Sequence, residues 1–372
     1  MSDEGSLHDP ADPIYDGIER LEWDERKEED TPFKRWRQMT RRTALTGGAA
    51  GIGALLLEAC GSSSSSKSSA ASGSSASSIF GGQSYKFTFV NHVTTNPFFA
   101  PTQTGAADAC KLLGCSYQWT GSQTSNVSEM VNALNSAVAA SVNGIAISLV
   151  DPTAFNAPVA KALSGGVPVV AYNADVPTNA RLAYIGQDLF LSGQQLGSHI
   201  ASLVPSGSVA LFIATPGSLN IQPRINGALS TLKSHPSITT QVVATGAAVP
   251  TELSTIQAFA KGHPNTAGMF AVDAGSTQSV AQTIQQQGLK GKVKGGGYDL
   301  LGPTVTLLND GYIQVTIDQQ PYLQGFFPIM ELYLYNASGR VTGLADIDTG
   351  LKFVTAANVA PYLKSTASRY EK

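Results

Sequence analysis

Apolar runs alternate with amphipathic segments along most of the chain after Tyr85. Strand-like runs cover residues 85–90, 116–120, 144–150 and 167–172, and helix-like segments cover 102–113, 127–141 and 153–164. The strand-like runs are nearly continuously apolar, which is typical of parallel strands covered by helices on both faces. This alternating order predicts a parallel sheet with right-handed crossovers.

The same alternation repeats in the second half of the chain. After residues 183–188 and a helix at 189–203, we expect strands at 208–214, 239–244, 268–272 and 293–298, with helices at 220–233, 252–262 and 275–287. A last segment, 314–354, contains a strand-like run, a helix to about Tyr335 and the strand-like sequence LKFVT. We expect this segment to return to both halves and to complete both sheets.

The sequence therefore predicts an α/β protein with two doubly wound parallel-sheet lobes. The N-terminal lobe is expected to comprise residues 84–187 plus 320–349, and the C-terminal lobe residues 188–319 plus 350–364. Three chain crossings, near 174–188, 318–320 and 348–351, are expected to join the lobes as a three-stranded hinge.

The composition of the 372-residue chain narrows the range of functions. Charged residues make up 14% of the sequence and the net charge is -3, so nothing indicates nucleic-acid binding. Residues 1–60 carry 8 Lys+Arg and 13 Asp+Glu, whereas the remaining residues carry 16 and 14. The part expected to fold is nearly neutral, which suits an uncharged or weakly charged ligand better than a polyanion.

Residues 1–60 are interpreted as an export signal. Arg41 and Arg42 precede an apolar stretch that is too short to span a bilayer and that ends at Cys60. The Thr-Arg-Arg-x-x-Leu sequence resembles a twin-arginine (Tat) signal. The residues up to Cys60 resemble a bacterial lipobox, which implies acylation of this cysteine, although Glu58 stands where a small or apolar residue is usual.

A Ser-rich segment follows the signal. Residues 61–79 are almost entirely Ser, Ala and Gly, a composition that cannot bury a core and behaves as a flexible tether. We expect the tether to extend over 61–83. The order of signal, cysteine and tether predicts an exported domain that is lipid-anchored at the outer face of the cytoplasmic membrane.

The other two cysteines, Cys110 and Cys115, flank the end of the first predicted helix. They can pair if the helix ends at Gly114 and the chain turns back, or they can remain two separate core thiols. The five histidines are scattered, and no His/Cys cluster has the spacing of a metal site. We therefore predict neither a metal nor a cofactor.

Polar residues stand where the apolar strands stop. Ligands of open α/β sheets bind at the carboxyl ends of the strands, so these residues are candidates for ligand binding. They are accompanied by two adjacent phenylalanines and by an arginine near the start of a predicted helix. The candidate set is Asn91, Asn96, Phe98, Phe99, Asn173, Asp175, Arg224, Asp273, Asp299 and Gln319.

Each of these residues, taken alone, has a simpler explanation. Asn and Asp favour helix N-caps and turns, and a phenylalanine before a helix can be a hydrophobic staple. Taken together, the set combines amides, carboxylates, one guanidinium and two aromatic rings. Hydroxyl groups both donate and accept hydrogen bonds, and the C–H faces of a sugar ring pack on aromatic rings. The combination therefore indicates a polyhydroxyl ligand.

From Tyr85 to about Thr355 the chain resembles the ribose-binding proteins, the type 1 periplasmic sugar-binding proteins of ABC transporters. Asn96-Pro97-Phe98-Phe99 is similar to the NPFF turn of that family. Gly297-Tyr298-Asp299 is similar to its GFD segment, whose Asp binds the ligand. Arg224 falls on the ligand-binding Arg of the family, and Gln319 on a Gln that reaches the cleft.

The chain departs from the family pattern at three positions. Asn173 stands where the family commonly has Asp, and Ala174 stands where a basic residue often follows. Asp273 replaces the Asn of the family's FAxN segment. These departures argue against assuming that the ligand is ribose.

The resemblance implies the periplasmic binding protein-like I fold, a monosaccharide or polyol bound in the cleft between the lobes, and no enzymatic activity. It also implies delivery of the ligand to ABC permease subunits by a monomeric protein. Two alternatives share the fold: a ligand-sensing receptor component, and a lactose-repressor-type effector domain, which requires an N-terminal DNA-binding helix-turn-helix. The sequence does not fix the sugar, so pentoses, hexoses and inositols all fit.

Overall fold

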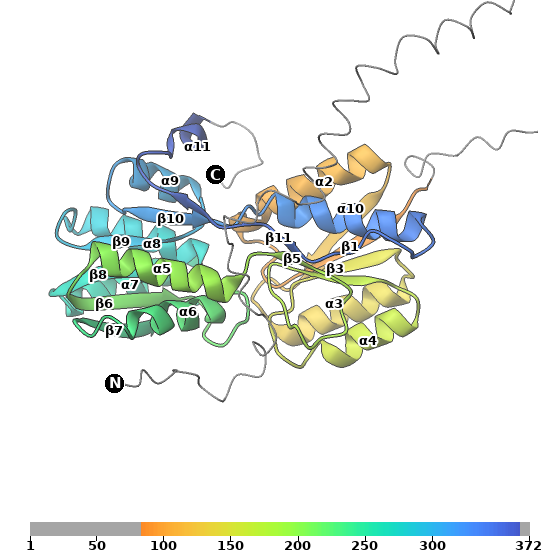
Figure 1. The fold of residues 1–372 in the computed structure, drawn as a ribbon, viewed down its shortest axis with the longest axis horizontal. Helices are drawn as coiled ribbons and strands as arrows, with labels where there is room; N and C mark the ends of the chain where they lie inside the picture. Colours follow the sequence, from red (N-terminus) through yellow and green to blue (C-terminus); the bar gives the residue numbers. More distant parts are fainter. Residues whose placement is uncertain (1–82, 365–372) are drawn as a thin grey trace, which may run out of the picture. The chain divides into compact units, whose positions relative to one another are not determined.

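The structure is a computed structural model that describes residues 83–364. The predicted export signal of residues 1–60, with Cys60, and the predicted tether up to residue 82 lie outside the described residues. Each half of the described chain is built on one six-stranded sheet with helices on both faces (Figure 1).

The first sheet has the strand order β11-β5-β4-β3-β1-β2, and all of its pairings are parallel. Its strands are β1 (Lys86–Asn91), β2 (Ser116–Gly121), β3 (Gly144–Ile147), β4 (Val169–Tyr172), β5 (Tyr184–Gly186) and β11 (Ile347–Asp348). The helices that cover it are α2 (Ala100–Leu113), α3 (Val127–Ala139), α4 (Asn156–Ser164) and α10 (Leu323–Ala337).

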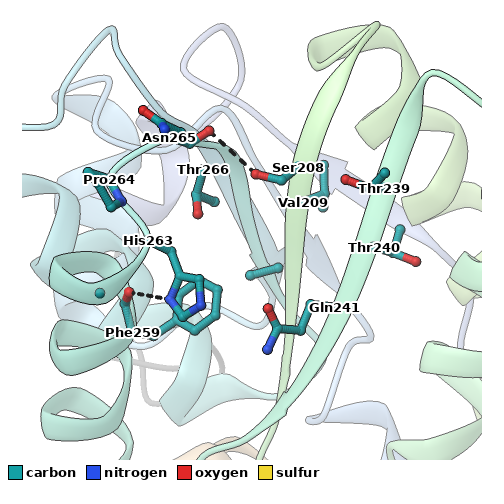
Figure 2. Close-up of a pocket in the computed structure, with 12 residues that line it drawn as sticks. Ser208, Val209, Thr239, Thr240, Gln241, Phe259, His263, Pro264, Asn265 and Thr266 are labelled. Atoms are coloured by element: carbon teal, nitrogen blue, oxygen red, sulfur yellow. Dashed lines mark hydrogen bonds between the residues drawn. The ribbon is translucent and has the colours of Figure 1, made fainter.

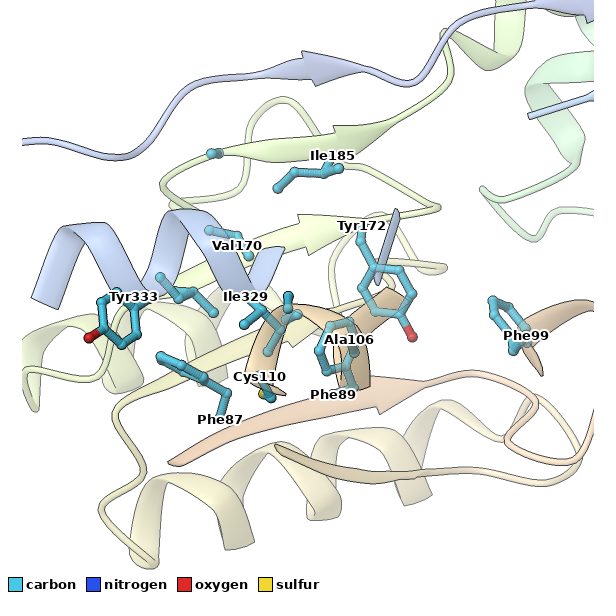
Figure 3. Packing of buried hydrophobic residues seen from close by; sticks show 14 of the residues in the cluster. Phe87, Phe89, Phe99, Ala106, Cys110, Val170, Tyr172, Ile185, Ile329 and Tyr333 are labelled. Atoms are coloured by element: carbon cyan, nitrogen blue, oxygen red, sulfur yellow. The ribbon is translucent and has the colours of Figure 1, made fainter. Parts of the chain in front are cut away.

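Side chains of the first sheet point alternately to its two faces, as the pleat of a strand requires. Phe87 and Phe89 of β1 belong to a buried cluster with residues of α2 and α10 (Figure 3). Ile145 and Ile147 of β3 belong to a separate buried cluster with residues of α3 and α4. Two apolar layers therefore hold β1 and β3 in place, and with them the turns at their carboxyl ends.

The second sheet has the strand order β12-β10-β9-β8-β6-β7. Its strands are β6 (Gly207–Ile213), β7 (Ile238–Ala244), β8 (Thr266–Ala271), β9 (Lys294–Tyr298), β10 (Val315–Asp318) and β12 (Lys352–Val354). Helices α5 (Leu189–Leu203) and α6 (Gln222–Leu232) pack on one face. On the other face lie α7 (Val249–Gly262), α8 (Ala274–Gln286), α9 (Gly302–Asn309) and α11 (Ala360–Lys364).

The chain passes between the two sheets three times. It crosses from β5 to α5, from β10 to α10, and from β11 to β12. Side chains of the first two crossings bond to backbone of the third: Gln187 Nε2 donates to Gly350 O at 3.0 Å, and Gln320 Nε2 donates to Thr349 O. The predicted fold class, with two doubly wound lobes, is confirmed.

Helix α2, which follows the turn after β1, is held in place by close packing against α10. A Cβ atom added to Gly325 would lie 1.8 Å from Thr102 O, and one added to Gly105 would lie 2.1 Å from Tyr322 O. Backbone meets backbone at both points, and only glycine leaves room for this approach. The start of α2 is thereby held rigidly beside the end of β1.

Several elements differ from the sequence prediction. Helix α9 was not predicted, because its Gly302-Pro303 start looks like a turn, although Pro is well suited to the first turn of a helix. Helix α11 was also not predicted. The helix expected from residue 153 begins at Asn156, because Asp151 Oδ1 accepts hydrogen bonds from Thr153 N and Ala154 N and holds a turn there. Strand β12 pairs antiparallel with β10, whereas a purely parallel sheet was expected.

Cys110 and Cys115 are both free thiols. Helix α2 ends at Leu113, and Gly114 then adopts a left-handed conformation with φ 72°. The chain turns back so that Cys115 N donates to Cys110 O at 3.1 Å. Of the two possibilities that the sequence left open, the structure therefore has the unpaired one.

Candidate functional site

The turn after β1 presents two aromatic rings on a rigid support. Asn96 Oδ1 accepts a hydrogen bond from Phe98 N at 3.0 Å, and Pro97 opens a short 3-10 helix, Pro97–Phe99, that runs directly into α2. The Phe98 and Phe99 rings meet edge to face with 4.7 Å between centroids. Both rings are buried, and both residues line the same cavity. The Asn-Pro-Phe-Phe sequence therefore marks a pair of rings that pack together at one cavity.

Asn173 directly follows β4 and has a strained backbone conformation, with φ 64°. Asn tolerates the left-handed region better than most residues. Its Nδ2 donates to Gln324 Oε1 at 3.2 Å and lies 3.5 Å from Gln319 Oε1. Its Oδ1 is buried and has no hydrogen-bond partner among the described residues. A buried acceptor without a partner is costly, so this atom is suited to a ligand donor.

Arg224, near the start of α6, is anchored on three sides. Its side chain is 2% exposed, its Nη1 donates to Val272 O at 2.9 Å, and its Nη2 lies 3.4 Å from Gln187 Oε1. Its Cζ stands 4.0 Å from the centroid of the Tyr298 ring, a cation–π contact. Its Nε is buried and has no partner among residues 83–364. The guanidinium is therefore held in place while one of its nitrogens, Nε, has no partner among the described residues.

Two carboxyl groups follow strands of the second sheet. Asp273 caps α8: its Oδ1 accepts from Ser276 N at 2.8 Å and its Oδ2 from Ala214 N at 2.9 Å. Asp299 follows β9 with φ 74°, and its Oδ1 accepts from Gln319 Nε2 at 2.8 Å. Burial raises the pKa of Asp299 to about 7, against the opposing effect of the Arg224 charge. Burial also raises the pKa of Asp273.

These groups line one cavity. Side chains from both lobes contribute. The lining residues are His92, Asn96, Phe98, Phe99, Asn173, Asn220, Ile221, Arg224, Asp273, Ala274, Asp299 and Gln319. Eight of the ten candidates from the sequence are among them.

Asn91 and Asp175 are the two candidates that do not line this cavity. Asn91 is fully buried, with Nδ2 donating to the Tyr172 hydroxyl at 2.7 Å and Oδ1 accepting from Val93 N at 2.8 Å. Asp175 accepts two hydrogen bonds from Arg181, at 2.9 and 2.6 Å. Both side chains have protein partners, so the structure does not bring these two candidates together with the other eight.

His92 and Asn220 line the cavity but were not predicted. The two side chains come from different lobes, and His92 Nε2 lies 3.1 Å from Asn220 Nδ2. The other ring nitrogen, Nδ1, lies 3.1 Å from Ser148 Oγ. Burial lowers the pKa of His92 to about 4, so the imidazole is neutral near pH 7 and Nε2 accepts from the amide. His92 and Asn220 are 128 positions apart in the sequence, so no local motif could show that their side chains meet.

A second cavity lies at the other end of the second sheet (Figure 2). It is lined by the first residues of β6 and β7 and by the end of α7, including Ser208, Thr240 and His263. The His263 ring stacks on Phe259, with 4.1 Å between centroids. This cavity lies at the amino ends of its strands, whereas ligands of such sheets bind at the carboxyl ends. It has none of the candidate residues.

Among residues 83–364, no group of His, Cys, Asp and Glu side chains is arranged to hold a metal ion. Within the same described range, no helix is both long enough and apolar enough to cross a bilayer.

The geometry defines a two-lobed α/β ligand-binding protein whose site is enclosed by both lobes. Residues 87–339 match the family described as the periplasmic binding protein domain. Over 304 residues, the chain is 52% identical to the xylose/arabinose-binding protein XylF of Sulfolobus acidocaldarius. The matched residues make up 77% of this chain and 75% of the relative. The chain therefore belongs to the periplasmic binding protein family.

Solved structures agree with this assignment. An ABC transporter solute-binding protein from Burkholderia graminis, in complex with D-arabinose, is 28% identical with a TM-score of 0.71, over 75% of this chain and 98% of that one. A carbohydrate transporter solute-binding protein from Agrobacterium radiobacter, also in complex with D-arabinose, is 26% identical with a TM-score of 0.69, over 76% and 98%.

Proposed function

We propose that this protein binds a monosaccharide, with pentoses as the first candidates, in the cavity between its lobes and delivers it to an ABC permease outside the cytoplasm. The observation that carries the proposal is the unpaired polar chemistry of the cavity. Asn173 Oδ1 and Arg224 Nε are buried without partners among the described residues, beside the Phe98 and Phe99 rings. The relatives named above bind or are described as binding pentoses.

The cavity suits a neutral polyhydroxyl ring. Arg224 donates hydrogen bonds, Asp273 and Asp299 accept them, and amide side chains do both. A hydrogen bond to a charged group is stronger than one between neutral groups and fixes the orientation of the ligand hydroxyl. The two phenylalanine rings supply an apolar surface for the C–H face of the sugar. Orientation and stacking together select a ring of suitable size and hydroxyl pattern.

Binding is coupled to closure of the lobes. His92 and Asn220 meet across the cleft, and Leu219 N donates to Val150 O at 3.0 Å, so two contacts between the lobes form beside the cavity. A sugar that touches both lobes adds contacts that only the closed form provides. It therefore shifts the population toward that form, which is the form a permease would recognise.

A thermal-shift screen over pentoses, hexoses and inositols tests this function. A ligand bound only by the folded state raises the melting temperature by an amount that depends on its concentration. We expect one or more pentoses to give the largest increase. A screen in which no sugar raises the melting temperature would count against the proposal.

The proposed location depends on residues outside the described range. A twin-arginine signal ending at Cys60 would place the protein at the outer face of the cytoplasmic membrane, held by an acyl chain and a Ser-rich tether. Metabolic labelling with a fatty acid should label the wild-type protein and not Cys60→Ser. Replacement of Arg41 and Arg42 by Lys should keep the protein in the cytoplasm. Equal labelling of both proteins would exclude Cys60 as the acylation site.

We further propose that the protein acts as a monomer and releases its ligand unchanged. Sedimentation with and without sugar should give the mass of one chain. Nuclear magnetic resonance spectra of the sugar should be the same before and after prolonged incubation with the protein. New sugar resonances would indicate turnover and would contradict a pure binding function.

A further inference from the structure

A further cavity adjoins the proposed sugar cavity. It is here called the side cavity. The two share one wall, formed by His92, Asn96, Asn220, Ile221, Asp273 and Ala274. The two cavities are therefore direct neighbours, with no more than these shared residues between them.

The strand order shows in which direction the side cavity extends. The residues found only in the sugar cavity include Asn173, Asp299 and Gln319, which follow β4, β9 and β10. Those found only in the side cavity include Thr215 and Ala247, which follow β6 and β7. Strand β7 is the edge strand farthest from β12, where the chain crosses between the lobes. A ligand longer than one ring would extend from the sugar cavity toward this edge.

The side cavity is lined by hydroxyl groups and, besides the shared Asp273, by one further acid. Ser125, Thr215 and Ser218 contribute hydroxyls, and Glu252 of α7 contributes a carboxyl group. The Glu252 side chain is 3% exposed, and its Oε2 has no hydrogen-bond partner among the described residues. A buried polar atom in a native structure without a partner requires an explanation, and a missing ligand is one.

The chain makes room for this carboxyl group. A Cβ atom added to Gly275, in the first turn of α8, would lie 2.0 Å from Glu252 Oε2 and 2.9 Å from Oε1. Any larger residue at position 275 would push the carboxyl group away.

The carboxyl group is suited to a neutral partner. Burial, and secondarily the charge of Asp273, raise the pKa of Glu252 to about 9, so it is protonated at neutral pH and both donates and accepts. None of the described residues that line the side cavity is Lys or Arg. A ligand hydroxyl satisfies such a group, whereas an anion would meet no cation there.

We propose that the side cavity is a second sugar subsite, in which a pentose joined by a glycosidic bond to the first ring places a hydroxyl against Glu252. The natural ligands then include pentose disaccharides as well as single pentoses. This inference rests on the proposed function of the sugar cavity. The glycosidic bond would pass between the six residues that line both cavities.

The test is a pair of calorimetric titrations, with D-xylose and with its β-1,4-linked disaccharide, on four forms of the full chain. Wild-type protein should bind both sugars. Glu252→Ala should weaken binding of the disaccharide about tenfold more than binding of xylose, because a buried hydrogen bond is lost only with the second ring. Glu252→Gln, which also donates and accepts, should restore most of the difference.

Glu331→Gln is the matched control, because Glu331 is also a buried acid with an unpartnered Oε2 but lies in α10 and lines neither cavity. It should change neither affinity. If Glu252→Ala does not fold, Gly275→Ala serves instead, since its methyl group displaces the same carboxyl group. If wild-type protein binds xylose but not the disaccharide, the second subsite is overturned and the proposed function is not. The same holds if Glu252→Ala loses equal affinity for both sugars. Failure of wild-type protein to bind either sugar would overturn the proposed function as well.

Discussion

Acidification should destabilise this protein through His92, and the structure gives the size of the effect. The His92 ring is buried between Ser148 and Asn220, and its pKa is lowered from 6.5 to about 4. Because the unfolded chain binds the proton more tightly, the stabilising contribution is fully present above the unfolded pKa. It is lost as the pH falls toward the folded pKa. Linkage gives a loss of about 2 kcal/mol between pH 8 and pH 5.

Urea denaturation at a series of pH values checks this figure. The free energy of unfolding of wild-type protein should fall by about 2 kcal/mol more than that of His92→Gln over the same interval, because only the wild-type protein carries the buried imidazole. All other titrating groups are common to the two proteins and cancel in the comparison. His235→Asn is the control, since its imidazole is exposed and loses little hydration on folding.

The result that refutes this reasoning is a pair of parallel profiles. If wild-type protein and His92→Gln lose the same free energy of unfolding between pH 8 and pH 5, then His92 is not held neutral by burial. An imidazole that titrates near pH 6.5 in a nuclear magnetic resonance experiment would lead to the same conclusion. In either case the contact between His92 and Asn220 across the cleft would need another description.

Three further predictions concern the site and its support. Gly325→Ala should lower the free energy of unfolding by about 3 kcal/mol in urea denaturation, because its methyl group would meet the backbone of Thr102. Asp175→Ala should lower it by about 1–2 kcal/mol through loss of the Arg181 contact, with unchanged sugar affinity; a large loss of affinity would return Asp175 to the binding site. Asp299→Ala should cost about 1–3 kcal/mol of sugar binding by calorimetry, and an unchanged affinity would remove it from the site.

The two-lobed architecture could be predicted because it depends on local patterns. Buried parallel strands are continuous apolar runs, and their alternation with helices requires crossovers of one hand. The end of each strand is then also predictable, and so are the polar residues that line the cleft there, such as Asn173 and Asp299. Helix α9 escaped prediction because Gly302-Pro303 favours a turn as much as a helix start.

The rest of the site depends on contacts between residues that are distant in the sequence. Asn91 stands at a strand end like Asn173, but its amide is used by the Tyr172 hydroxyl, 81 residues away. No local pattern shows whether a polar side chain already has a partner. His92 and Asn220 likewise meet across the cleft although they are 128 positions apart, so no local pattern pairs them.

The most direct test of the central claim is a calorimetric titration of D-xylose into wild-type protein and into Arg224→Ala. Arg224 is the buried cation of the cavity, and its Nε has no hydrogen-bond partner among the described residues. We predict saturable binding of one sugar per chain to wild-type protein and about tenfold or greater weakening in the variant, through loss of a charged hydrogen bond. Equal affinities in two folded proteins would contradict the claim that the sugar occupies this cavity.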